Sequence, residues 1–329
     1  MTIKDFTDIH DKKGLMKAVL YDFTMDAMGV DLADKYRKAD AFGRYVVYTS
    51  FPGYLDPDVQ SYLLQEVYKK VWKNTWPADW VASDTMTSFN SKLIQLLQLR
   101  QNDELDGKKL VVYKREAGNK AFSKELFVRW YIEEKINKDK LFDFCGPVLP
   151  LLQVYHTIGN FCPVPPHFNV ARSGSHGNYD YWDLTLNKIH ECYFPKNEKV
   201  QDIIEKQLFH GNSKGDVNAC LQWINSYGQK EEGWKKFIEL NFMQDYVDDD
   251  YNPKPFVKGH TWENNRFKNI ENMMAFSIEA ERRIIKRGIR IISCMNSDLT
   301  FDGKELDENG IDRFAEEIIM QLNKNNMEL

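Results

Sequence analysis

Apolar residues recur at helical spacing along most of the second half of this sequence, and this periodicity restricts the fold more than any other feature. The longest pattern runs from Trp262 to Arg287, with Gly288 as the expected C-terminal cap and a β-like segment over 289–295. Its expected apolar stripe contains Phe267, Ile270, Met274, Ile278, Ile284 and Ile285. Shorter helical patterns occupy 199–209, 216–227, 234–243 and 311–322. The second half is therefore predicted to be mainly helical.

The first half mixes helical and strand patterns. Asp56 and Pro57 are typical of a helix start, because Asp caps the first amides and Pro lacks an amide hydrogen that the first turn leaves unpaired. The helix that follows is expected to reach Trp76 and to stop before Pro77. Further helices are expected over 88–99 and 121–136, and strands over 42–51 and 110–113.

The composition suits a chain with a full hydrophobic core. Hydrophobic residues make up 43% of the sequence, which is enough apolar surface to offset the chain entropy lost on folding. No Gly/Ser/Pro-rich linker divides the 329 residues. We therefore predict one compact α+β domain over residues 1–329, predominantly α-helical with a few short strands. The alternative division has a mixed subregion over 1–150 and a helical subregion over 151–329.

Charge and cysteine content narrow the class of protein. A net charge of -5 argues against a protein that coats nucleic acid. The stretch from Lys108 to Lys140 is locally basic, and a nucleic-acid partner there is an alternative that the overall charge does not favour. The five scattered cysteines are predicted to be buried free thiols in a reducing cytoplasm. No apolar run approaches the length of a membrane span, so no membrane partner is expected.

The segment from Tyr155 to Asp183 concentrates polar side chains between two apolar helical patterns. A dense polar group in a loop is a typical place for binding or chemistry. His156 and Asp183 are the catalytic candidates, because His can act as a base and a carboxylate can hold a metal ion. The candidate binding residues are Asn160, Asn169, Arg172, Asp180 and Trp182.

The same side chains have a structural explanation. The two Asn side chains would bond to loop backbone, Asp180 or Asp183 would cap the helix expected over 184–192, and Arg172 would pair with one of these carboxylates. An enzyme would bring the polar groups together with His156 in an exposed cleft. A structural staple would instead bury them and pair them with one another.

Other candidate motifs are incomplete. The acidic run over 245–250 lacks the Gly and the alternating oxygen ligands of a calcium loop, so we expect a solvated turn. The stretch Gly211–Asp216 lacks the order of a phosphate loop and is expected to be a turn with Asp216 as the next helix cap. No complete nucleophile or cofactor motif occurs, and the sequence identifies no cofactor. No zinc pattern fits the spacing of His156, Cys162, His167 and His176, so we predict no metal site.

A combination of short motifs is similar to that of a known family. The motifs are Thr157-Ile158-Gly159, Asn169, Ala171-Arg172, Asp180 and Trp182-Asp183-Leu184-Thr185-Leu186. They resemble those of an uncharacterised family of cytoplasmic bacterial proteins, frequent in Firmicutes, whose members carry a closely similar Trp-Asp-Leu-Thr-Leu block. This chain has Ser173 where that family has Gly. The resemblance marks positions and implies no activity.

A second resemblance is local. His156-Thr157-Ile158-Gly159-Asn160-Phe161, with Asn169 downstream, is similar to a segment of HNH-like nuclease domains. Those nucleases also need an upstream Glu-His pair whose His is the general base, and this chain contains no Glu-His dipeptide. The resemblance therefore implies a nuclease-like segment without its usual base.

These observations lead to two hypotheses. The first is a cytoplasmic binding or interaction protein, in which the 155–183 loop forms a recognition pocket or a structural staple. Its expected partner is an unknown protein or a small anionic ligand. The alternative is a metal-dependent phosphodiesterase, a nuclease-like enzyme or a nucleotide-processing enzyme, with a role in phage defence.

Overall fold

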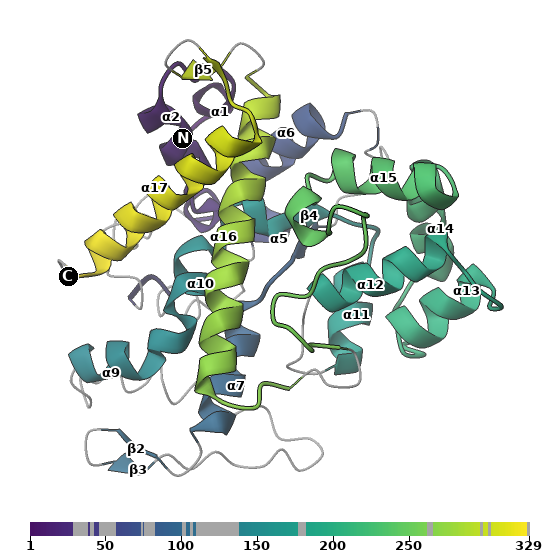
Figure 1. Cartoon of the computed structure of the whole chain (residues 1–329), viewed down its shortest axis with the longest axis horizontal. Helices are drawn as coiled ribbons and strands as arrows, with labels where there is room; N and C mark the ends of the chain where they lie inside the picture. Colours follow the sequence, from purple (N-terminus) through teal and green to yellow (C-terminus); the bar gives the residue numbers. More distant parts are fainter. Residues whose placement is uncertain are drawn as a thin grey trace.

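The longest helix, α16 (Ile270–Cys294), runs through the middle of the structure (Figure 1). It begins at Asn269, whose side chain accepts a hydrogen bond from the Asn272 amide. Elements from both halves of the chain pack against it. They are α2 (Lys12–Val19), α7 (Phe89–Leu99), η2 (Gly146–Val148), α10 (Leu149–Val154), η3 (Ile158–Asn160), η5 (Gln244–Tyr246) and α17 (Glu308–Met327).

The computed structural model describes residues 1–28, 39, 43–45, 57–73, 75, 83–100, 103–105, 108–109, 138–176, 182–261, 266–296, 299–301 and 304–327. Within them the chain has the predicted compact α+β fold, predominantly α-helical with a few short strands. The strand expected over 110–113 and the helix expected over 121–136 lie outside the described residues, as does most of the basic stretch over 108–140. Of the strand expected over 42–51, residues 43–45 are described and are helical.

The observed course of α16 corrects the prediction for this region. The helix passes through Gly288 and ends at Cys294, so the segment expected to be β-like is helical. Met274 and Ile278, which were expected in the apolar stripe, are each 44% exposed. The C-terminal half of the helix is buried nearly all round, so its apolar residues do not follow one stripe.

Two glycines allow α16 and η3 to cross closely. A Cβ atom on Gly159 would lie 1.9 Å from the Ile284 carbonyl oxygen and 2.9 Å from the Gly288 amide nitrogen. A glycine inside a helix costs about 0.5–1 kcal/mol relative to alanine, and here the close packing offsets that cost. Gly288 therefore serves the crossing with η3 rather than a helix cap.

The N-terminal half supplies short helices and turns around α16. The helix expected after Pro57 is divided at Ser61, whose hydroxyl caps the second part by accepting from the Leu64 amide. This second part ends at Val71, before the predicted end at Trp76. The remaining elements are α1 (Lys4–Thr7), η1 (Phe23–Met25), α5 (Pro57–Gln60), α6 (Tyr62–Val71) and α9 (Lys138–Cys145).

The described strands form three short antiparallel pairs. In the first pair, β1 (Ser83–Thr85) lies beside β4 (Phe161–Pro163), with Asp84 opposite Cys162. The second pair joins β2 (Glu104–Leu105) to β3 (Lys108–Lys109), and the third joins β5 (Thr300–Phe301) to β6 (Lys304–Glu305). The first pair connects the chain before α7 to the polar segment that the sequence singled out.

A group of helices within residues 168–240 lies to one side of α16, on the right in Figure 1. Its core is aromatic: the Trp223 ring lies 5.4 Å from the Phe168 ring and 5.3 Å from the Phe237 ring, between centroids. Asp216 caps α14, as predicted, by accepting from the Ala219 amide. The group contains α11 (Phe168–His176), α12 (Trp182–Tyr193), α13 (Val200–Asp202), the π-helical η4 (Ile203–Leu208), α14 (Val217–Ser226) and α15 (Lys230–Leu240).

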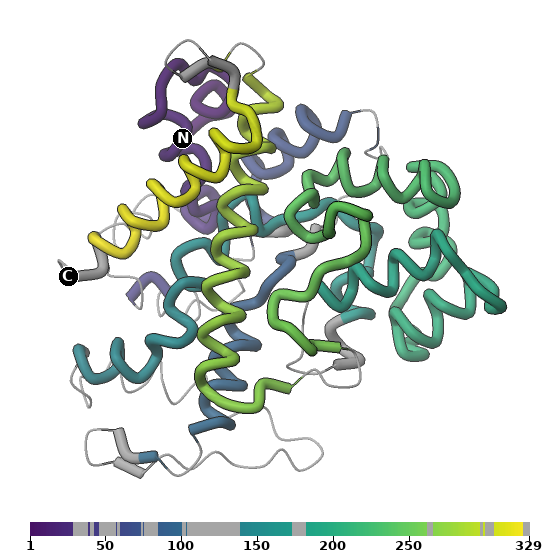
Figure 2. The backbone as a smooth tube through the Cα atoms, viewed as in Figure 1, coloured from purple at the N-terminus to yellow at the C-terminus, as the bar shows by residue number. Residues whose placement is uncertain are grey.

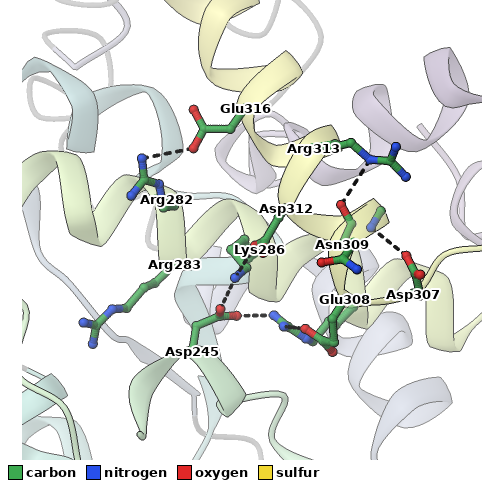
Figure 3. Close-up of polar contacts among 12 residues, drawn as sticks. Asp245, Arg282, Arg283, Lys286, Asp307, Glu308, Asn309, Asp312, Arg313 and Glu316 are labelled. Atoms are coloured by element: carbon green, nitrogen blue, oxygen red, sulfur yellow. Dashed lines mark hydrogen bonds and ion pairs between the residues drawn. The ribbon is translucent and has the colours of Figure 1, made fainter. Parts of the chain in front are cut away.

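Charged side chains join α16 to α17 (Figure 3). Arg282 Nη2 lies 3.0 Å from Glu316 Oε1, and Lys286 lies between Asp245 and Asp312. The Asp245 side chain is only 13% exposed. The expected solvated turn over 245–250 is therefore wrong for Asp245, whereas 248–250 are exposed.

The helix α17 also packs beside the N-terminal part of the chain. It buries Ile311, Phe314, Ala315 and Ile318. Its outer side passes beside the N-terminal helices (Figure 2), where Lys12 Nζ lies 3.0 Å from Glu317 Oε1. Burial of the apolar side chains contributes more than this exposed ion pair, which is worth at most about 1 kcal/mol.

The cysteines follow the prediction with one exception. Four are buried free thiols, whereas Cys294, the last residue of α16, is exposed. None of the described helices is long and apolar enough to cross a membrane.

Candidate functional site

The segment from Tyr155 to Asp183 is built of short elements where the structure describes it. It contains η3, β4, α11 and the start of α12, so the prediction that residues 155–183 form a loop is wrong for its described residues. Pro163, Pro165 and Pro166 all precede α11, where they do not interrupt its hydrogen bonds. The candidate Asp180 lies outside the described residues.

His156 is buried beside the N-terminal part of the chain. Its Nδ1 atom lies 2.7 Å from Thr24 Oγ1, and its ring stacks on the Tyr155 ring at 4.0 Å. Burial lowers the pKa of His156 to about 4, although the Asp22 carboxylate acts in the opposite direction. The imidazole is therefore neutral at pH 7, and at 5% exposure it does not face a surface cleft.

Asn160 has no exposed surface and bonds to the backbone of its neighbours. Its Oδ1 atom accepts from the Thr87 amide at 2.9 Å, and its Nδ2 atom donates to the carbonyls of Thr87 and Tyr155 at 3.0 and 2.7 Å. The side chain thereby extends the β1–β4 pair beyond Thr85. All three of these hydrogen bonds join the Asn160 side chain to main-chain atoms rather than to a ligand.

Arg172 and Trp182 hold α11 against α12. Arg172 Nη1 donates to Thr185 Oγ1 at 3.2 Å, and its guanidinium lies 5.8 Å from the centre of the Trp182 ring. Both side chains are buried. Asn169 lies in the first turn of α11 and is partly exposed.

Asp183 is the second residue of α12 and does not cap it. Its Oδ2 atom accepts from the Phe256 amide at 3.0 Å and lies 3.1 Å from Nδ1 of His260. Both partners belong to the stretch of bends and turns before α16. Sequence reasoning missed His260, because 77 positions separate it from Asp183 and no spacing rule links two such residues.

The sequence candidates therefore do not form one exposed cleft. The bonds of His156 lead to the segment around Thr24, whereas those of Asp183 lead to Phe256 and His260. In the described part of the chain, no three His, Cys, Asp or Glu side chains gather in a way that would hold a metal ion. His156, Asn160, Arg172 and Asp183 are buried, as the structural explanation expected. Asp183 does not cap α12, however, and the hydrogen bonds described above go to residues outside the candidate set rather than from one candidate to another.

Asp183→Ala is expected to lower the free energy of unfolding by about 3 kcal/mol, because it removes the acceptor of the buried Phe256 amide and the carboxylate beside the His260 ring. Urea unfolding followed by circular dichroism measures this change. Asp249→Ala, at an exposed position, is the matched control and should change stability by less than about 0.5 kcal/mol. Equal unfolding midpoints for both variants would contradict the role assigned to Asp183.

A hollow of about 560 Å³ lies where α12 and α14 end and α15 begins. Its apolar lining includes Tyr193, Phe194, Pro195 and Ile224. Tyr193 Oη donates to the Ile224 carbonyl at 2.8 Å, which ties the end of α12 to α14. We call this site the apolar hollow.

A second hollow of about 430 Å³ shares Phe194 and Glu231 with the first. Aromatic rings of His190, Trp234 and Tyr251 contribute to its lining. Its carboxylates come from Glu231 and from Asp249 and Asp250, and its ammonium group comes from Lys235. We call this site the acidic hollow. Sequence reasoning did not find either hollow, because their residues come from helix ends and a turn that are distant in the chain.

Comparison of this chain with family models, with curated proteins and with solved structures gave no match. The functional argument therefore depends on the geometry alone.

Proposed function

We propose that this chain is a binding protein that acts through the two hollows around Phe194. The observation that carries the proposal is a pair of adjoining surface hollows, of about 560 and 430 Å³, with Phe194 as their common wall. Hollows of this size are typical of ligand sites. Phe194 is 40% exposed, and an exposed aromatic side chain between two hollows is a typical anchor for a partner.

The Tyr155–Asp183 segment has a supporting role in this proposal. Asp183 and Trp182 anchor the first turn of α12, and the same helix ends at Tyr193, beside Phe194. The contacts of Asp183 with Phe256 and His260 thus hold the first turn of α12 in place. Phe194, which the two hollows share, follows directly after the other end of this helix. A rigid support of this kind reduces the entropy lost on binding.

An enzyme that uses His156 and Asp183 has less support. Both side chains are at most 5% exposed, and their hydrogen bonds go to different partners. A metal-dependent phosphodiesterase would need a water-accessible metal site beside its base. We therefore propose binding rather than catalysis, with the recognition site at the two hollows instead of in the 155–183 segment.

Phenol is expected to bind in the apolar hollow and to shift amide signals of the residues around Ile224 and Phe194. Asn225→Trp, which adds a large ring to the lining at an exposed position, should abolish these shifts. Gln222→Trp is the matched control, because Gln222 is exposed on the same helix α14 and does not line the hollow. Two-dimensional amide spectra measure both.

Two results would contradict the proposal. One is a set of phenol-induced shifts scattered over the surface. The other is shifts near Phe194 that persist unchanged in Asn225→Trp.

A further inference from the structure

We infer that the occupant of the two hollows is a basic, apolar segment of a partner protein, which places a Lys or Arg side chain in the acidic hollow and a neighbouring apolar side chain in the apolar hollow. The inference rests on the proposed function and adds the chemistry of the partner. It depends on the charge of the acidic hollow, on the aromatic rings around that charge and on the apolar lining next to it.

The acidic hollow has an excess of negative charge. Three carboxylates, those of Glu231, Asp249 and Asp250, line it together with a single ammonium group, that of Lys235. Burial lowers the pKa of His190, so its ring adds no positive charge at pH 7. A cation is therefore the ligand whose charge complements this lining.

Aromatic rings in the same lining also favour a cation. The rings of His190 and Trp234 are in contact, with centroids 4.9 Å apart, and the His190 and Phe194 rings are 4.6 Å apart. Aromatic faces attract ammonium and guanidinium groups through the ring quadrupole. Carboxylates beside aromatic rings are thus suited to Lys and Arg side chains.

The protein already places an ammonium group at this position. Lys235 Nζ lies 5.3 Å from the centre of the Tyr251 ring and 2.8 Å from Glu231 Oε1. These are the two kinds of contact that a ligand cation would make. Lys235 consequently competes with the ligand for Glu231 and Tyr251, and its removal should strengthen binding.

The turn that carries the other two carboxylates is held in place. The Asp248 carboxylate accepts from the amides of Asp250 and Asn252 at 3.0 and 2.8 Å. Trp234 Nε1 donates to the Tyr251 carbonyl at 2.7 Å, which fixes the turn to α15. Asp249 and Asp250 are both exposed beside the hollow. Little ordering is then needed when a cation binds.

The apolar hollow makes a protein segment a better occupant than a small amine. The two hollows share Phe194 and Glu231, and the lining of the apolar hollow also includes Val200 and Ile224. A segment with a basic residue next to an aliphatic or aromatic one fills both hollows at once. A small amine would leave the larger hollow without a ligand group.

The first experiment compares three four-carbon probes of similar size, butylamine, 1-butanol and butyrate, by amide-shift titration of the full chain at pH 7. We expect butylamine to bind at least about fivefold more tightly than 1-butanol, and butyrate most weakly. The double variant Asp249→Asn with Asp250→Asn should remove the preference for butylamine. Lys235→Met should increase butylamine affinity by about threefold or more.

The matched control for the charge change is the double variant Glu66→Gln with Glu271→Gln. These residues lie on α6 and α16, outside the lining of both hollows, so the preference for butylamine should persist. Equal affinities of the three probes, in a protein that still binds phenol, would overturn the inference about charge and leave the proposed function intact. Loss of phenol binding would instead remove the proposed function.

The second experiment tests the partner by calorimetry with two capped peptides, Leu-Lys-Leu-Arg and Leu-Glu-Leu-Glu. We expect the basic peptide to bind at least about tenfold more tightly than butylamine, because it occupies both hollows. Asn225→Trp should remove this gain while preserving butylamine binding. A basic peptide no tighter than butylamine would overturn the assignment to a protein segment and indicate a small amine.

Discussion

Gly159→Ala is expected to prevent the chain from reaching its native structure. The new Cβ atom would lie 1.9 Å from the Ile284 carbonyl oxygen and 2.8 Å from the Ile284 carbonyl carbon. Both are backbone atoms inside α16, so they cannot move away as a side chain would. Separating η3 from α16 would break the packing that joins the two halves of the core, at a cost above about 4 kcal/mol.

Circular dichroism, urea unfolding and the dispersion of amide signals measure this effect. Gly146→Ala is the matched control, because a Cβ atom there would meet nothing within 4 Å. Gly288→Ala should have an intermediate effect, since its nearest contact would be the Val19 side chain at 3.2 Å. A well-folded Gly159→Ala variant with the stability of the Gly146 control would show that the crossing is less close than described.

The second large effect is expected for Arg287→Met, which should lower the free energy of unfolding by about 3–5 kcal/mol. Arg287 is fully buried and serves three carbonyls. Nε donates to Asn241 at 2.8 Å, and Nη1 donates to Gly159 and Phe161 at 2.8 and 2.7 Å. Methionine fills much of the same space, so the loss measures the three acceptors left without donors.

Arg282→Met is the control for this change, because it removes the same functional group from the same helix. Its side chain is 46% exposed and pairs with Glu316, so a loss below about 1 kcal/mol is expected. Urea unfolding of both variants gives the comparison. Similar losses at the two positions would mean that the carbonyl bonds of Arg287 contribute little beyond its packing.

The sequence predicted the helices that carry strong local signals. Asp216 precedes α14, and its side chain caps this helix as its position indicated. Local hydrogen bonds and apolar periodicity act within a few residues, so they can be read without knowledge of the rest of the fold. The predominantly helical α+β class followed from the same signals.

Predictions failed where a distant part of the chain decided the outcome. Gly is the residue that most often ends a helix, but α16 continues through Gly288, where η3 packs closely against the helix. Met274 and Ile278 have the spacing of core residues, but they are exposed because the described neighbours of α16 pack elsewhere. Periodicity shows which face is apolar and does not show which faces other elements cover.

The candidate site shows the same division. The sequence indicated that the Tyr155–Asp183 segment is unusually polar. In the structure, buried hydrogen bonds of this segment connect separate parts of the core. Which partner each side chain has, such as His260 for Asp183, depends on elements that only the fold brings together.

The sequence alone thus determined the helical class, the Asp216 cap of α14 and the position of the polar segment, because these depend on neighbours a few residues apart. The tertiary structure alone decided that His156 and Asp183 are buried in separate networks and that Phe194 lies between two hollows. Burial and surface shape depend on contacts across the whole chain, and no local pattern of residues specifies those contacts.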